Sequence, residues 1–188
     1  MDLPVGNIVS EIDLKASDVM LPLFECVVNS IISLKKRTDI ALPLKKIQIQ
    51  ITRGDMPSAP DLFEFNKTIQ SIKIIDNGIG FTKENFESFD TAYSRINKEY
   101  GCKGIGRFTV LAAFEKIEVT SNYVEDGEWK RRHFDFDPET EVRMIEDEPS
   151  EVQELKTTVH LQSLYNSTIK DASAKSLDSI AEDLMNHR

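Results

Sequence analysis

Residues 69–80 read IQSIKIIDNGIG, a hydrophobic strand pattern that runs directly into an aspartate and two glycines. The β-branched isoleucines favour an extended strand, and Asp-Asn-Gly is a common turn after one. The segment 45-KKIQIQITR-53 alternates strictly between isoleucine and polar residues, as a half-buried strand does. A loop containing proline, 55-DMPSAP-60, follows it. The sequence therefore predicts an antiparallel pair of strands, with Asp76 at the end of the second.

Further strand and helix patterns surround this pair. Strand composition is found at 116–123, 129–136 and 155–164, and more weakly at 141–145. Helical patterns are found at 18–36, 105–114 and 171–185, the last with Asp171 as its expected cap. The dipeptide Asp126-Gly127 favours a tight hairpin turn, and the acidic stretch 146–154 is expected to be a loop.

The order of these elements predicts the fold class. Strands follow one another after the first helices instead of alternating with helices, which disfavours a Rossmann fold. We expect an α+β fold, a two-layer α/β sandwich. Its sheet would be mostly antiparallel or mixed, with helices covering one face.

The composition is that of one folded, acidic domain. The 188 residues include 23 Lys and Arg against 32 Asp and Glu, a formal net charge of −9. This length fits a single domain over 1–188, and the charge gives no indication of nucleic-acid binding. No apolar run approaches the ~18–20 residues that span a bilayer, so no membrane association is expected. Two cysteines, Cys26 and Cys102, are too few for a disulfide framework, and a cytoplasmic location is expected.

The helical pattern at 18–36 brings two polar side chains together. Glu25 and Asn29 are four residues apart, so they lie on the same face of a helix. With the apolar stripe centred on Phe24, both fall at the margin where the core meets a cavity or solvent. Cys26 is expected to point away from the core. Alone, such a pair is most often an ordinary feature of a helix surface.

Two glycine-containing motifs add chemistry to this pair. In 76-DNGIG-80, the carboxylate can accept a hydrogen bond from an exocyclic amine, and the glycines let the backbone pass close to a flat ring. In 101-GCKGIGRF-108, glycines lead into a helix whose free N–H groups favour a phosphate, and Lys103 and Arg107 add positive charge. The spacing matches neither a P-loop nor a dinucleotide-binding motif.

Together and in this order, the three motifs resemble the N, G1 and G2 boxes of the GHKL ATPases. This family includes gyrase B, the ninety-kilodalton heat-shock chaperones, MutL and MORC proteins. The resemblance spans Glu25 to Phe108 and implies the Bergerat fold, with ATP and Mg²⁺ as cofactors. The polar stretch 81–103, with a short helix expected after Thr82, then corresponds to a mobile ATP lid.

The resemblance also implies a role for the matching residues. Glu25 would orient or deprotonate the attacking water, and Asn29 would bind the Mg²⁺ that bridges the phosphates. Asp76 would recognise the adenine amine. The full set of implied nucleotide contacts is Asn29, Asp76, Gly78, Gly80, Ser94, Gly101, Lys103, Gly104, Ile105, Gly106, Arg107, Phe108 and Thr157.

Two positions depart from the family pattern. Thr157 resembles a strand threonine that helps the aspartate to bind adenine, but Lys156 stands where the family has glycine, and Thr158 is a competing candidate. Ile32 stands where many members have an aspartate in the N box.

The resemblance implies partners as well as a cofactor. ATP or ADP would be bound, the lid region would mediate an ATP-dependent homodimer, and a transducer domain would follow in a larger protein. The isolated domain is therefore expected to hydrolyse ATP weakly.

Two alternatives share the fold. One is an ATP-binding regulatory module without turnover. The other is the catalytic domain of a histidine kinase, which typically has Asn at the position of Glu25. The histidines of this chain, His133 and His160 in predicted strands and His187 near the end, do not suit a phosphoacceptor helix.

Overall fold

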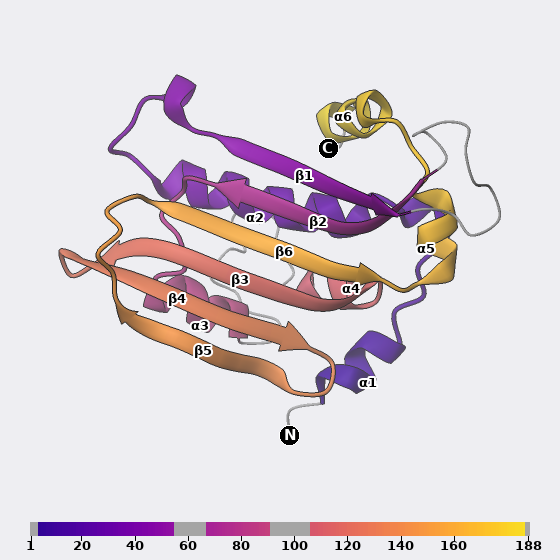
Figure 1. Cartoon of the computed structure of the whole chain (residues 1–188), viewed down its shortest axis with the longest axis horizontal. Coiled ribbons are helices and arrows are strands. Elements are labelled where there is room, and N and C mark those ends of the chain that lie inside the picture. Colours follow the sequence, from indigo (N-terminus) through magenta and orange to yellow (C-terminus); the bar gives the residue numbers. More distant parts are fainter. Residues whose placement is uncertain (1–3, 55–66, 91–105, 187–188) are drawn as a thin grey trace.

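The computed structural model describes residues 4–54, 67–90 and 106–186. Its centre is a six-stranded antiparallel sheet in the order β1-β2-β6-β3-β4-β5 (Figure 1). The strands are β1 (Ile47–Gly54), β2 (Thr68–Asp76), β3 (Phe114–Glu125), β4 (Glu128–Asp137), β5 (Glu141–Pro149) and β6 (Lys156–Leu164). The last strand returns between β2 and β3, so it joins the N-terminal strand pair to the β3–β4–β5 meander.

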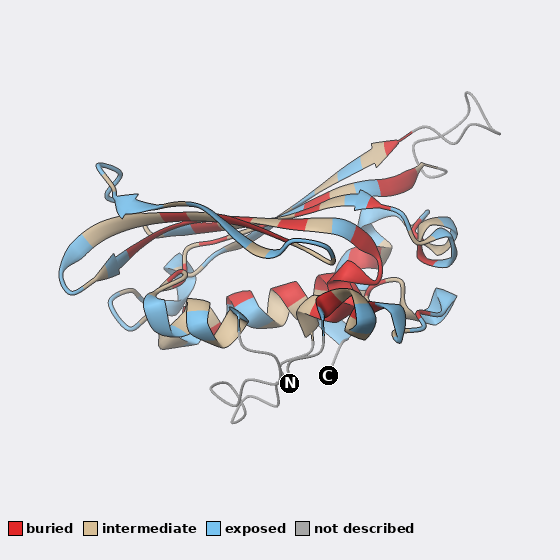
Figure 2. Ribbon diagram, turned by 90° about the horizontal axis from the view of Figure 1, so that it is seen from below, coloured by how far each residue is buried: buried red, intermediate tan, exposed pale blue. Residues whose placement is uncertain are grey.

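The helices lie on one side of this sheet (Figure 2). They are α1 (Val5–Ser10), α2 (Leu21–Lys36), α3 (Lys83–Asp90), α4 (Gly106–Leu111), α5 (Ser167–Ala172) and α6 (Leu177–Asn186), with 3-10 turns at Ala16–Asp18 and Leu42–Leu44. Within the described ranges the other face of the sheet carries no helix. The α+β class is thus confirmed, and the arrangement is compatible with a two-layer sandwich.

Most strand predictions are confirmed. β1 and β2 pair antiparallel, with Ile47 opposite Asp76. The β3–β4 turn has φ 54° at Asp126 and 81° at Gly127, so both central residues are left-handed, as a two-residue hairpin of type I′ requires. β5 is longer than predicted, because 146–149 continues the strand and Glu146 forms an ion pair with Arg131 of β4 at 2.8 Å.

The prediction of one C-terminal helix over 171–185 is wrong, since two helices form. The Asn166 side chain caps α5 by accepting the N–H of Ile169 at 3.2 Å, and Asp171 lies inside that helix. Ser173 ends it: its hydroxyl donates to the Lys170 carbonyl at 2.7 Å and accepts the Ile69 N–H at 2.9 Å. The Asn166 cap and the two hydrogen bonds of Ser173, one of them with distant Ile69, therefore divide the segment.

The predicted helix at 105–114 is also shorter than expected. α4 ends at Leu111, and β3 begins at Phe114. Tyr165 explains the early stop, because its backbone N–H donates to the Ala113 carbonyl at 3.0 Å and its hydroxyl to the Leu111 carbonyl at 2.9 Å. These carbonyls thus accept hydrogen bonds from Tyr165, directly after β6, and not from a further turn of the helix.

The buried face of α2 is turned by one residue from the predicted stripe. The helix begins at Leu21 with Pro22 in its first turn, where a missing N–H costs nothing. Leu23, Cys26 and Ser30 are buried, whereas Phe24 is half-buried. The expectation that Cys26 points away from the core is therefore wrong, and burial raises the pKa of its thiol to about 12.

The segment Ala16–Lys36, which includes α2, is 21 residues long and apolar enough, by length and composition alone, to cross a membrane. The sequence analysis found no apolar segment long enough to span a bilayer, and this segment is an exception. A core helix of a folded domain meets the same criterion. In this fold, Leu23 and Cys26 of the segment pack in the hydrophobic core.

Aromatic rings hold α3 against the sheet. Thr82 caps the helix as predicted, accepting the N–H of Asn85 at 3.4 Å. Phe81, Phe86 and Phe89 lie against Phe134 of β4, with ring centroids 5.3, 5.1 and 5.3 Å from it. Residues 81–90 are thus packed on the sheet. The sequence analysis, which expected a mobile cover over 81–103, did not predict this packing. The remainder of the predicted lid, 91–103, lies outside the described residues.

Buried Arg132 of β4 ties the start of this layer to the sheet. Its guanidinium donates to the Phe81 carbonyl at 2.7 Å and forms an ion pair with Asp147 of β5 at 3.0 Å. It also lies over the Phe86 ring, 4.8 Å from the centroid. The segment is therefore held by polar as well as aromatic contacts.

Replacing Phe134 by alanine tests this packing. Because the ring is fully buried and contacts three other phenylalanines, we expect Phe134→Ala to lower the free energy of unfolding by about 3–5 kcal/mol. Urea denaturation followed by circular dichroism measures the change. Leu42→Ala is the control, because Leu42 is 80% exposed. A similar small loss in both variants would contradict the packing.

Candidate functional site

A cavity of about 160 Å³ lies between α2, α3, the start of α4 and the helix-facing side of the sheet. Residues from all three sequence motifs and from β6 line it: Glu25, Asn29, Asp76, Gly80, Gly106, Arg107 and Thr157. They come from positions up to 132 residues apart, 157 minus 25. The fold therefore brings together side chains that the sequence analysis linked only by their order.

Asp76 lies at the inner end of the cavity and is 4% exposed. Its Oδ2 accepts the hydroxyl of Ser30 at 2.8 Å, and its Oδ1 accepts the backbone N–H of Gly78 at 2.9 Å. The strand end, the following glycine turn and α2 thus meet at one carboxylate.

Thr157 stands directly opposite Asp76 in the β2–β6 register and is 3% exposed. Its hydroxyl lies 2.9 Å from that of Ser121, which in turn accepts the N–H of Phe81 at 3.0 Å. Thr158 alternates to the other face of the sheet. The sequence left open whether Thr157 or Thr158 faces the site. In the structure, Thr157 faces the cavity and Thr158 does not.

Burial raises the pKa of Asp76 to about 6, and the hydrogen bonds from Gly78 and Ser30 oppose this rise. The carboxylate is thus poorly solvated and has few donors around it. A ligand that brings an N–H group to this end of the cavity would stabilise the charged form.

Glu25 and Gly106 are in close contact at the other side of the cavity. A Cβ added to Gly106 would lie 2.1 Å from Glu25 Oε2, so glycine at this position leaves the Glu25 carboxylate its present place. Asn29 is exposed at the cavity margin. The side-by-side arrangement of Glu25 and Asn29 predicted from their spacing agrees with their shared place on the wall.

Positive charge lines the cavity at two separate places, Lys36 near the 76–80 turn and Arg107 next to Gly106. Lys36 and Arg107 are on the cavity wall, and Lys36 Nζ donates to Asn85 Oδ1 at 3.2 Å. The Arg107 guanidinium lies over the Phe108 ring, 4.4 Å from its centroid. Burial lowers the pKa of Arg107 to about 10, so the side chain remains charged at neutral pH.

The two glycines of the 76–80 motif are required for different reasons. Gly80 has φ +79°, a left-handed conformation that favours glycine, and an added Cβ would lie 2.7 Å from Ser121 Oγ. An added Cβ on Gly78 would lie 2.2 Å from Ser33 Oγ of α2. The second glycine shapes the turn, and the first lets the turn approach the helix.

Some predicted contacts are not on the cavity wall. Phe108 is fully buried in the core against Phe136, because the first turn of α4 directs it between the helix and the sheet, and it does not line the cavity. Gly78 does not line it either, and its N–H donates to Asp76. Ser94, Gly101, Lys103, Gly104 and Ile105 lie outside the described residues.

Sequence reasoning missed three polar members of the site. Ser30 and Ser121 complete the hydrogen bonds around Asp76 and Thr157, and Asn85 donates to the Gly80 carbonyl at 2.6 Å. Ser121 falls at an inward position of its strand, beside Val119 in the alternating pattern, which could have indicated it. Ser30 could not be found without the true orientation of α2.

No model of a known protein family matches this chain, and no curated protein matches it either. Its function is therefore inferred from the geometry and chemistry of the site.

The raised pKa of Asp76 predicts a pH-dependent effect of Asp76→Asn. The folded state keeps a proton that the unfolded chain releases near pH 4, so this contribution to stability is present below about pH 4 and lost as pH rises through about 6. Relative to the parent chain, Asp76→Asn should gain roughly 3 kcal/mol of stability between about pH 3 and about pH 7, on either side of these two values. Urea denaturation at both pH values measures the difference.

Exposed Leu42 provides the control, because Leu42→Ala removes no titratable group. This variant should change stability equally at the two pH values. A difference between Asp76→Asn and the parent chain that does not vary with pH would contradict the buried, proton-binding state of Asp76.

Proposed function

We propose that this chain is an ATP-binding and slowly ATP-hydrolysing module of the GHKL type with a Bergerat fold. The observation that carries the proposal is the convergence, on one cavity, of buried Asp76 beside Thr157 and of Glu25 and Asn29 beside Gly106. A recognition carboxylate and a candidate general base thus share a cavity that also carries two cations.

The end of the cavity formed by Asp76 and Thr157 suits an adenine ring. Asp76 can accept a hydrogen bond from the exocyclic amine, and the Thr157 hydroxyl can donate or accept beside it. Ile117, Val119 and Val159 supply an apolar wall for a flat ring. The 3% and 4% exposure of Thr157 and Asp76 makes such contacts strong, since water competes little.

The opposite side suits the phosphates. Arg107, which follows Gly106, would offset their charge, and the absence of a side chain on Gly106 leaves room beside Glu25. Asn29 fits a Mg²⁺–nucleotide complex, in which most ligands of the ion are phosphate and water oxygens and one amide oxygen is enough from the protein. Bound Mg²⁺ would neutralise phosphate charge.

Glu25 would act as the general base. Its carboxylate would accept a proton from the attacking water as the new oxygen–phosphorus bond forms and the bond to the leaving ADP oxygen breaks. Lid closure, ATP-dependent dimerisation through the lid region and coupling to a transducer domain are part of the same proposal. The histidine kinase alternative has less support, because His133 and His160 lie in sheet strands on the side away from the cavity.

Two substitutions separate binding from turnover. Asp76→Asn should weaken ATP binding by about 10-fold or more, since a hydrogen bond to a charged group contributes roughly 1.5–3 kcal/mol. Glu25→Ala should retain ATP binding and lower single-turnover hydrolysis by about 10²–10⁴-fold. Isothermal titration calorimetry with ATP and Mg²⁺ measures the first effect, and release of labelled phosphate measures the second.

Glu182→Ala on the exposed face of α6 is the control and should change neither quantity. Unchanged affinity in folded Asp76→Asn would refute the adenine site. ATP binding by the parent chain with no detectable release of phosphate would instead favour the regulatory module without turnover.

A further inference from the structure

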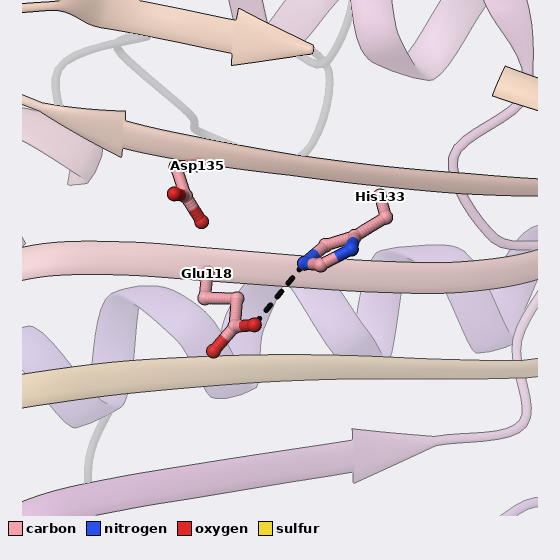
Figure 3. A group of neighbouring side chains, drawn as sticks. All are labelled: Glu118, His133 and Asp135. Atoms are coloured by element: carbon pink, nitrogen blue, oxygen red, sulfur yellow. Dashed lines mark hydrogen bonds and ion pairs between the residues drawn. The ribbon is translucent and has the colours of Figure 1, made fainter. Parts of the chain in front are cut away.

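A second group of ligand-type side chains lies on the sheet face that carries no described helix. Glu118 of β3 and His133 and Asp135 of β4 each offer one ligand atom, and these atoms all lie within 4.8 Å of one another. Figure 3 shows the His133 ring over β3 with a nitrogen toward Glu118, the Glu118 carboxylate on the β6 side of β3, and Asp135 between β3 and β4. Asp135 is only 2% exposed, so the group is partly enclosed although the face is open.

The strand register creates this group. Glu118 stands directly opposite Asp135, and His133 follows two residues away on the same face of β4. On an antiparallel pair, direct and diagonal neighbours are within reach of one another. The three side chains are therefore positioned by backbone pairing and not by a loop.

Neighbouring side chains orient the Glu118 carboxylate. Glu118 Oε1 lies 3.1 Å from His133 Nε2, while its Oε2 accepts Gln162 Nε2 at 2.5 Å and lies 3.5 Å from His160 Nδ1. The outer oxygens of a metal-binding carboxylate are commonly held in this way. Glu118 is thus fixed from β6 on one side while its other oxygen faces His133.

Asp135 is held by two cations. Its Oδ2 forms ion pairs with Lys116 at 3.3 Å and Arg143 at 2.6 Å. These cations hold the carboxylate in place, and they also compete with a bound metal ion. Arg143 is largely exposed, with 62% of its side chain accessible, so it can move away at small cost.

We propose that Glu118, His133 and Asp135 form a binding site for a divalent transition-metal ion of the Zn²⁺ class. One imidazole nitrogen and two carboxylate oxygens are a ligand set that Zn²⁺ accepts, and three protein ligands leave one position open. Tetrahedral ligand atoms at about 2.1 Å from Zn²⁺ lie roughly 3.4 Å apart. The pair His133 Nε2 and Glu118 Oε1, 3.1 Å apart, is already near this separation, and the Asp135 ligand atom lies within 4.8 Å of both.

The site is independent of the proposed ATPase function. The cavity is lined by the inward residues Ile117 and Val119 of β3, whereas Glu118, between them in the sequence, points to the other face. Zn²⁺ binding can therefore be measured on the full chain without nucleotide. Success or failure of the nucleotide experiments does not affect its result.

Calorimetric titration of chelator-stripped protein with Zn²⁺ tests the proposal. We expect one equivalent to bind, and binding to be lost in His133→Asn and in Asp135→Asn. His160→Asn should weaken binding by about 10- to 100-fold, as loss of an orienting partner does. Co²⁺ provides a second readout, because its visible absorption reports tetrahedral coordination by these ligands.

Glu154→Gln, at an exposed position before β6, is the matched control and should bind Zn²⁺ like the parent chain. Circular dichroism of each variant separates loss of the site from loss of the fold, and Glu118→Gln supplies a fourth variant if Asp135→Asn is unstable. No Zn²⁺ uptake by the parent chain, or uptake that His133→Asn and Glu118→Gln leave unchanged, would overturn the proposal and leave only an ion-pair network.

Discussion

The buried carboxylate of Asp76 is the constraint on which the arrangement of this molecule depends. It lies at the end of β2, accepts the Ser30 hydroxyl of α2 and accepts the Gly78 N–H of its own turn. A carboxylate with this little exposure costs free energy unless donors surround it. The orientation of α2, the glycine turn and the pairing with Thr157 are together what make its burial possible, and they also form the inner end of the cavity.

The sequence predicted the parts of the fold whose signals are local. Alternation predicted β1 and β2, and Asp126-Gly127 predicted the hairpin turn. The buried face of α2 could not be predicted in this way, because apolar residues surround much of the helix and a polar residue, Ser30, belongs to the face toward the sheet. The division between α5 and α6 was missed for a related reason: Ser173 ends a helix through a distant N–H, that of Ile69.

The same distinction applies to the candidate site. Spacing placed Glu25 beside Asn29, and the strand end placed Asp76, but neither could show that Thr157 lies opposite Asp76 or that Ser121 bridges it to Phe81. Those contacts depend on β6 pairing between β2 and β3. This pairing joins segments far apart in the sequence, so no local sequence pattern indicates it. Phe108 illustrates the converse, since membership of a motif did not make it part of the cavity wall.

The aromatic layer beneath α3 couples residues 81–90 mechanically to the sheet. Phe81, Phe86 and Phe89 share the ring of Phe134 as a common contact, and Arg132 holds the backbone at Phe81. Because closely packed rings transmit displacement, a ligand that moves α3 would transmit strain directly to β4.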